Sequence, residues 1–136
     1  MILTRIFDDD TFDRTLAQWT WLDFTNKKPI MSSLFGDLFF VGPDGYWFLS
    51  IFDGRLTREW PNRDALVDAL NSESGADEWL TGTLAMAADR RGVTLADGQV
   101  YAFAPHPVFT GTFEIEAVMA LDLVVAHAAA SQALRP

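Results

Sequence analysis

Residues 38–60 read LFFVGPDGYWFLSIFDGRLTREW and hold the densest run of large apolar side chains in the sequence. Two turn signals divide this run at strand spacing, Gly42-Pro43-Asp44-Gly45 and Asp53-Gly54. Proline presets φ at about −65° and glycine supplies a positive φ, so the first signal predicts a tight turn. The Asp-Gly pair is typical of a two-residue hairpin. We therefore predict a three-stranded antiparallel meander over about 38–60, with its middle strand, Tyr46–Phe52, buried on both faces.

The segment before the meander predicts a helix. Phe12, Leu16 and Trp19 recur at spacings of four and three, which places them on one stripe of a helix over about Asp10–Trp21. Aspartates precede this stripe and suit the positive end of the helix dipole. The polar stretch 25–29 then reads as a break before the sheet.

Two helices are predicted after the meander. Asn62 is a favoured N-cap residue, and the apolar spacing behind it predicts a short helix over about Arg63–Asn71. Residues 72–77 read as a loop or cap region, and a longer helix is predicted from about Ala76 to Arg91. Gly92 suits the left-handed position that ends such a helix.

The C-terminal part combines a clear strand with an ambiguous segment. The run QVYAFA at 99–104 predicts a strand, which the stretch Pro105-His106-Pro107 stops. From about Glu114 the apolar spacing fits a helix that ends in the alanine-rich stretch His127–Leu134. A short strand near Val118–Leu121, before that helix, is an open alternative.

These elements predict an α+β fold, with an antiparallel sheet that is built on the meander, extended by a strand at about 99–104 and covered by helices. A length of 136 residues is near the usual size of one domain, so we predict a single domain over 1–136. Within it, 1–33 is expected to be an N-terminal helical segment and 34–136 the α+β core.

Aromatic residues make up 13% of the chain and include 11 Phe and 5 Trp. Rings of this size favour a core built around the meander. We expect the tryptophans to lie in the core, with one or two available as anchors in a protein interface: Trp19, Trp21, Trp47, Trp60 and Trp79.

Charge limits the classes of partner. The chain carries 19 acidic and 10 basic residues, which gives a formal net charge of −9. Such a surface repels nucleic acid and anionic membranes and attracts a basic protein. A surface that is acidic for solubility alone is the alternative.

The absence of cysteine excludes disulfides, thiolate metal sites and cysteine nucleophiles. No apolar run approaches the roughly 18–20 residues of a membrane-spanning helix. The first residues hold no apolar stretch long enough for a signal peptide. We therefore expect a cytoplasmic protein, a monomer or a weak homodimer, with no cofactor and no bound metal.

The titratable residues form no catalytic pattern. Asp8, Asp9 and Asp10 lie where helix caps lie, and the aspartates at 44 and 53 occupy usual turn positions, so capping and turn formation explain them. The two histidines, without cysteine or a His-Glu-x-x-His pattern, make a poor zinc site, and no serine lies in a nucleophile elbow. We expect His106 to be a hydrogen-bonding loop residue and His127 a helix-surface or packing residue.

Five short motifs occur in order along the chain: F-V-G-P-D-G-Y at 40–46, D-G at 53–54, E-W-L at 78–80, G-Q-V-Y-A-F at 98–103 and D-L-V-V-A-H-A-A-A-S-Q-A-L at 122–134. Over about 36–134 they resemble the C-terminal domain of bacterial type VI secretion immunity proteins of the Tdi type, formerly a domain of unknown function. In that family the domain often follows a GAD-like domain. Residues 1–33 are too short for one, so a stand-alone copy is expected. The resemblance implies an inhibitor that binds and blocks a cognate DNase toxin, and it brings no catalytic residues.

From the charge and the resemblance we predict a non-catalytic acidic binding protein whose negative surface docks on the basic substrate groove of a nuclease toxin. Electrostatic steering would speed association, and aromatic anchors would slow dissociation. The acids predicted to face the partner lie at segment ends: Asp8, Asp9, Asp10, Asp13, Glu73, Asp77 and Glu78. Two alternatives stay open. One is a small enzyme or ligand-binding domain with a pocket near Ala104–Gly111, where His106 and either Tyr46 or Tyr101 would lie, and the other is a homo-oligomeric scaffold.

Overall fold

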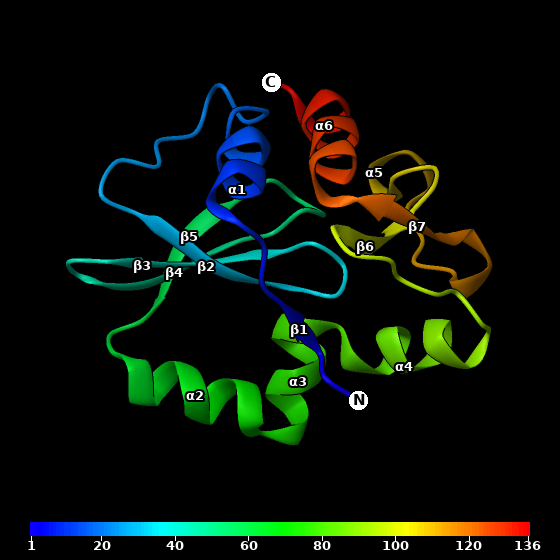
Figure 1. The fold of residues 1–136 in the computed structure, drawn as a ribbon, viewed down its shortest axis with the longest axis horizontal. Helices are drawn as coiled ribbons and strands as arrows, with labels where there is room; N and C mark the ends of the chain where they lie inside the picture. The colour runs from blue at the N-terminus through cyan, green and yellow to red at the C-terminus, as the bar shows by residue number, and fades with distance from the viewer.

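A computed structural model describes all residues, 1–136. Its first sheet has five strands in the spatial order β1-β2-β3-β4-β5, each antiparallel to its neighbour. These strands are β1 Thr4–Arg5, β2 Lys28–Ser33, β3 Leu38–Gly42, β4 Gly45–Leu49 and β5 Leu56–Trp60. Two further strands, β6 Gln99–Phe103 and β7 Val118–Asp122, form a separate antiparallel sheet beside the first (Figure 1).

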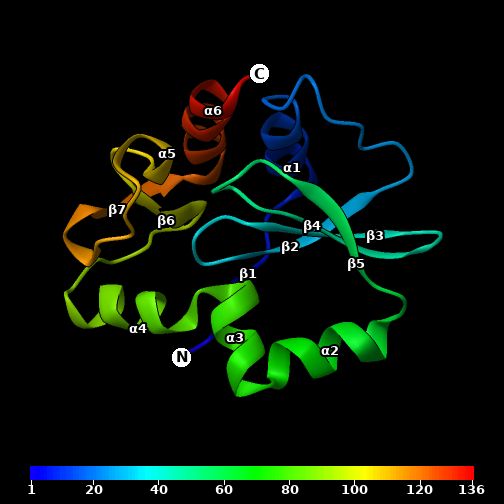
Figure 2. The same ribbon diagram turned by 180° about the vertical axis from the view of Figure 1, so that it is seen from behind.

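Helices cover both faces of the five-stranded sheet. The helices of the chain are α1 Asp9–Leu16, α2 Arg63–Asn71, α3 Glu73–Leu80, α4 Gly82–Arg90, α5 Pro107–Thr110 and α6 Leu123–Leu134, with a 3-10 turn, η1, at Ile115–Ala117. α1 and α6 lie side by side on one face of the sheet, whereas α2 and α3 lie on the other (Figures 1 and 2). The fold is therefore α+β, as predicted. No helix combines the length and apolarity that a membrane span requires.

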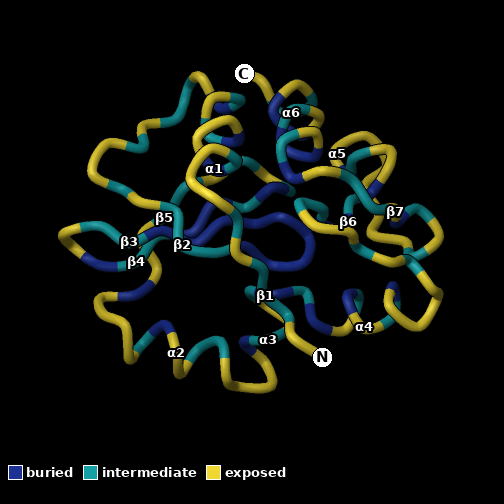
Figure 3. Tube along the Cα trace, viewed as in Figure 1, coloured by how far each residue is buried: buried dark blue, intermediate teal, exposed yellow.

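Strand alternation divides the core between the two faces of the sheet. Leu38 and Phe40 belong to a cluster with Trp19 and residues of α6, whereas Phe39 belongs to a second cluster with Trp60 and residues of α2 and α3. All three β3 side chains are fully buried. A third cluster lies between α4 and the second sheet. Figure 3 shows the buried stretch where β2, β3 and β4 meet at the centre of the molecule.

The meander is confirmed, and its second connection is corrected. β3, β4 and β5 pair in the predicted order, and Phe48 and Leu49 of β4 lie in opposite clusters. β4 ends at Leu49 rather than at Phe52, because the Ser50 amide bonds to the Arg55 carbonyl oxygen at 3.0 Å and closes a longer loop. The pair Asp53-Gly54 lies inside that loop, so the predicted two-residue hairpin is wrong.

The first 33 residues contribute strands that the sequence did not reveal. α1 ends at Leu16 rather than at Trp21, and β1 and β2 add two strands to the meander. The segment 1–33 is therefore part of the sheet and not only helical. β1 pairs only with Ser32 and Ser33 of β2, so Pro29 occupies a stretch of β2 that is open on one side, where proline is tolerated.

The predicted helix over Arg63–Asn71 is confirmed, with Asn62 as its cap, but the next helix is two helices. α3 begins inside the predicted loop, because Ser72 Oγ accepts a hydrogen bond from the Gly75 amide at 3.0 Å. A β-carbon at Gly75 would overlap the carbonyl oxygen of Ala69, so glycine here permits close packing of α2 against α3. Thr81, with a left-handed φ of 52°, separates α3 from α4.

The C-terminal strand exists but joins a different sheet. Residues 99–103 form β6, which pairs with β7 instead of extending the meander. β7 resolves the open alternative near Val118–Leu121 in favour of a strand, and α6 follows it directly. The two sheets are joined by a hydrogen bond of 2.7 Å from the Tyr101 amide to the Leu34 carbonyl oxygen.

Candidate functional site

The acids predicted to face a partner are all exposed and form two separate groups. The α1 cluster consists of Asp8, Asp9, Asp10 and Asp13, and the α3 cluster consists of Glu73, Asp77 and Glu78. α1 and α3 pack against opposite faces of the five-stranded sheet (Figures 1 and 2). One flat partner surface therefore cannot touch both clusters.

Three members of these clusters already have structural partners. Asp8 caps α1 by accepting a hydrogen bond of 2.8 Å from the Thr11 amide. Asp77 accepts hydrogen bonds from the amide and hydroxyl of Thr83, at 2.8 and 2.7 Å, at the start of α4. These hydrogen bonds stabilise the charged carboxylates and lower the pKa of Asp8 and of Asp77. Asp10 pairs with Arg14 one helical turn away.

Most of the negative charge is uncompensated by direct ion pairs. Only two of the 19 acidic residues take part in one: Asp10 with Arg14 at 3.0 Å, and Asp44 with Arg58 at 3.9 Å. Six of the seven members of the two clusters have no cation within ion-pair distance: Asp8, Asp9, Asp13, Glu73, Asp77 and Glu78. Unpaired surface charges act over roughly 8–10 Å at ordinary salt, so they are free to act on an approaching partner.

A buried carboxylate that no sequence pattern indicated organises the turn between β2 and β3. Asp37 accepts hydrogen bonds of 2.9 Å from the Ser33 hydroxyl and from the Ile51 amide, and no cation neutralises it. Burial raises the pKa of Asp37 to about 6, although both hydrogen bonds act in the opposite direction. Its position just before the apolar run, between Gly36 and Leu38, gave no signal beyond an ordinary turn.

His127 connects α6 to the turn between β2 and β3, and its side chain is fully buried. Its Nδ1 accepts a hydrogen bond of 2.8 Å from the indole N–H of Trp19, and its Nε2 lies 2.6 Å from the carbonyl oxygen of Gly36. Since an indole N–H only donates, the neutral ring carries its proton on Nε2. Burial lowers the pKa of His127 to about 4. It is a packing residue, which was one of the two roles predicted for it.

Ser33, Asp37 and His127 gather near one turn without forming a catalytic triad. The Ser33 hydroxyl donates to Asp37, and both nitrogens of His127 are occupied by Trp19 and Gly36. No group of three or more His, Asp and Glu side chains is arranged to hold a metal ion. These buried titratable groups hold distant parts of the chain together.

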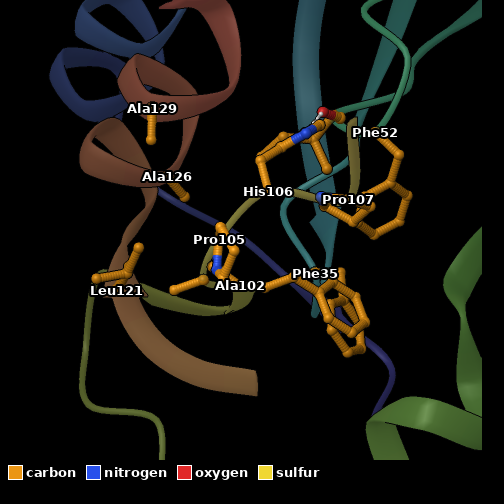
Figure 4. A pocket seen from close by; sticks show the side chains of 12 residues that line it. Phe35, Phe52, Ala102, Pro105, His106, Pro107, Leu121, Ala126 and Ala129 are labelled. Carbon is orange, nitrogen blue, oxygen red and sulfur yellow. Dashed lines mark hydrogen bonds between the residues drawn. The ribbon is translucent and has the colours of Figure 1, made fainter. Parts of the chain in front are cut away.

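An apolar cavity of about 150 Å³, here called the His106 cavity, opens between α6, the start of α5 and the loop after β4 (Figure 4). Phe35 and Phe52 form one wall, and Leu121 and Ala126 form the opposite one. Three lining residues are exposed, so the cavity reaches solvent: Ala104, Pro105 and Ala129. Neither Tyr46 nor Tyr101 lines it, contrary to the expectation that a pocket near His106 would include one of them.

His106 lines this cavity, but both of its ring nitrogens are bonded to backbone groups. Nδ1 accepts a hydrogen bond of 3.1 Å from the Val108 amide, and Nε2 lies 2.9 Å from the Ile51 carbonyl oxygen. A carbonyl oxygen only accepts, so Nε2 carries the proton. His106 is therefore the hydrogen-bonding loop residue that was predicted, and it has no free nitrogen to serve as a base in the cavity.

Exposed apolar side chains gather on the segments that build the cavity. Val108 and Phe109 on α5 are 49% and 71% exposed, and Phe113 and Met119 are 49% and 43% exposed. Phe113 packs edge-on against Phe52 of the cavity wall, with ring centroids 5.2 Å apart. We call these four residues the apolar rim.

No protein-family model matches the sequence, and a search of curated proteins found no significant match. Among solved structures, the fold is similar to the crystal structure of Atu4351 from Agrobacterium tumefaciens, with a TM-score of 0.67 and 18% sequence identity. The similarity covers 96% of this chain and 66% of that chain, so this chain spans about two-thirds of the length of its neighbour. At this level of identity, the comparison shows that the two proteins share an α+β fold.

Proposed function

We propose that this protein is a non-catalytic acidic binding protein, an immunity protein of the Tdi type that binds and blocks a basic nuclease toxin. The observation that carries the proposal is the uncompensated surface charge: of 19 acidic residues, only two form ion pairs. The motifs at 40–46, 98–103 and 122–134 support the choice of family. The same charge disfavours nucleic acid as a direct partner.

The mechanism is electrostatic capture followed by contact. A net charge of −9 accelerates the approach of a cationic partner, and this acceleration weakens as salt increases. The α1 and α3 clusters lie on opposite faces, so only one of them can form the contact with a single flat partner surface. The other cluster then contributes only to the long-range field.

A catalytic role has less support. Asp37 and His127 are fully buried, and each is held by hydrogen bonds to backbone and side-chain groups. His106 reaches a cavity but has both nitrogens occupied. A ligand-binding domain that uses the His106 cavity is the second candidate function, because the cavity is apolar and open. A homo-oligomeric scaffold would use the apolar rim, and light scattering would reveal it.

The test asks whether a gene neighbouring this one encodes a basic nuclease, and then measures binding to that gene's product at about 50 mM and about 500 mM salt. One variant carries Asp9→Lys and Asp13→Lys in the α1 cluster, and another carries Glu73→Lys and Glu78→Lys in the α3 cluster. These choices spare the capping residues Asp8 and Asp77. For one of the two variants we expect the association rate at low salt to fall about tenfold or more, with a much smaller loss at high salt.

The matched control carries Asp68→Lys and Asp89→Lys, which change the net charge equally at exposed positions on α2 and α4. The control is expected to lose less than about threefold in association rate, because only the long-range field changes. If all three variants lose the same amount of association rate, the acids act only through the net charge of the protein and not through contact with the partner. An absence of binding by the wild-type chain would refute the proposed function.

A further inference from the structure

The His106 cavity has the size of one ring. Its volume is about 150 Å³, the volume at which an apolar cavity in another protein stays dry and accepts benzene. Phe35, Phe52 and Phe103 supply aromatic surface, and Leu121 and Ala126 supply aliphatic surface. An occupant would therefore be a single phenyl or isobutyl group rather than an extended molecule.

The chemistry of the walls excludes a polar occupant. Pockets for metabolites combine apolar walls with a few polar groups that orient the ligand. Here the side chain able to supply such a group is His106, and its nitrogens are bonded to Val108 and Ile51. A polar ligand would lose hydrogen bonds to water on entry and find no free side-chain partner in return.

The surroundings of the cavity favour a protein as the source of the occupant. Met119 lies directly opposite Ala102 in the β6–β7 pair, so the two side chains share one face of that sheet, and Ala102 lines the cavity. Phe113 contacts the cavity walls Phe52 and Phe103. Exposed apolar residues grouped around a pocket are typical of protein interfaces, where one anchor side chain fills the pocket.

We infer that the His106 cavity is the socket for one apolar anchor side chain, Phe or Leu, carried on a basic segment of a partner protein. The apolar rim would cover the backbone around that anchor. Glu114 and Glu116 are exposed in the connection between Phe113 and Met119, without an ion-pair partner, and would receive flanking Lys or Arg side chains. The inference deepens the proposed function and rests on it for the positive charge of the partner.

The test uses the full chain and a defined probe, the peptide acetyl-Lys-Arg-Gly-Phe-Gly-Arg-Lys-amide. Methyl NMR spectra report cavity occupancy through the signals of Ala102, Ala126 and Leu121. We expect these signals to shift on addition of the peptide, and to remain unchanged when alanine replaces its phenylalanine. The affinity is expected to fall as salt increases, because the flanking charges contribute.

A cavity-filling variant separates the socket from the rest of the surface. Ala129 is exposed at the cavity mouth, and its methyl group faces the cavity (Figure 4). Ala129→Leu is expected to weaken peptide binding at least about tenfold while the protein stays folded, since the site is exposed. Ala17→Leu is the matched control, an identical change at an exposed position at the end of α1, and is expected to leave binding unchanged.

The outcomes distinguish this inference from the proposed function. Shifts with benzene but not with the peptide would make the cavity a site for free apolar molecules and would overturn the inference. Equal binding of the phenylalanine and alanine peptides would overturn it as well, because charge alone would then explain binding. If Ala129→Leu leaves toxin binding unchanged, the socket hypothesis is refuted and the proposed immunity function still stands. If the chain binds the peptide but not the toxin, the socket hypothesis stands and the proposed immunity function is refuted.

Discussion

The turn between β2 and β3 and the His106 cavity both lie where the first sheet meets the C-terminal half, and they are built in opposite ways. At the turn, Asp37 and the carbonyl oxygen of Gly36 bond to Ile51 and His127, and no buried side-chain nitrogen or oxygen lacks a partner. At the cavity, the walls are apolar and open to solvent. Polar groups thus hold the chain together at the turn, whereas the cavity leaves apolar surface exposed to solvent.

Removing the largest buried side chain of the polar region is expected to have the largest effect. Trp19 is 1% exposed and donates the hydrogen bond to His127. Trp19→Ala is expected to lower the free energy of unfolding by about 4 kcal/mol, because it leaves a large cavity and an unpaired ring nitrogen. Urea unfolding measures the change.

Trp47→Ala is the control, with an expected loss of about 1 kcal/mol, since Trp47 is half-buried and stacks with Lys27. Equal losses in both variants would contradict the central role of Trp19.

The pH dependence of the free energy of unfolding tests the two buried titratable groups. The pKa of Asp37 rises on folding from 3.8 to about 6, so its contribution to stability is full below about pH 4 and is lost as the pH rises through 6. The pKa of His127 falls on folding from 6.5 to about 4, so its contribution is full above about pH 6.5 and is lost as the pH falls through 4. In the wild type, the two slopes oppose each other between about pH 4 and 6.

Replacing one of the two groups at a time should show how each one alone changes the free energy of unfolding with pH. Relative to the wild type, Asp37→Asn is expected to gain stability as the pH rises from about 4 to 6, and His127→Gln to lose it, each by roughly 3 kcal/mol at most. Asparagine and glutamine each offer a hydrogen-bond donor and an acceptor but do not titrate. Urea unfolding over this pH range measures the difference. Parallel profiles for the two variants would show that these groups do not carry the assigned protons.

Gly36 tests how tightly the turn is packed. Its φ is +93°, and an added β-carbon would lie 3.3 Å from the side chains of Ile51 and Val100. Gly36→Ala is expected to cost about 2 kcal/mol, from backbone strain together with crowding. Gly98→Ala isolates the strain, since Gly98 has a φ of +81° with no atom within 4 Å of the added carbon, and should cost about 1 kcal/mol. Equal costs would mean that the turn has room to relax.

The smallest effect on stability is expected at the apolar rim. Phe109 is 71% exposed, so Phe109→Ser should change the free energy of unfolding by less than about 0.5 kcal/mol. Phe35→Ala, at a residue that is 1% exposed, should cost about 4 kcal/mol. Thermal and urea unfolding compare the two variants. A large loss with Phe109→Ser would place that ring in the stabilising core and remove it from the binding surface.

Local patterns predicted the elements whose signals are contained within a few residues. The meander, the helix over Arg63–Asn71 and the strand at Gln99 each combine an apolar pattern with a turn or cap beside it. The pattern failed where tertiary packing decides. Pro29 resembled a break, yet it lies in a strand that is open on one side, and Gly75 resembled a loop, yet it allows two helices to pack closely.

The site was predictable only in part, for the same reason. The exposed acids of α1 and α3 were identified from their positions at segment ends, but their separation onto opposite faces depends on the fold. The roles of Asp37 and His127 depend on partners that lie far away in sequence, such as Trp19, which is 108 positions from His127. The apolar rim has no periodic signal, because its members are divided among the single-turn helix α5, the connection after it and the strand β7.

The link between Trp19 and His127 also bears on synthesis of the protein. A ribosome completes β1 to β5 and the first four helices long before residue 127 emerges. Until then the indole of Trp19 and the carbonyl oxygen of Gly36 lack their native partner, and the apolar face that α6 will cover stays exposed to solvent. The nascent chain therefore exposes apolar surface until α6 is made, and the hydrogen bonds of His127 can form only when nearly the whole chain has been synthesised.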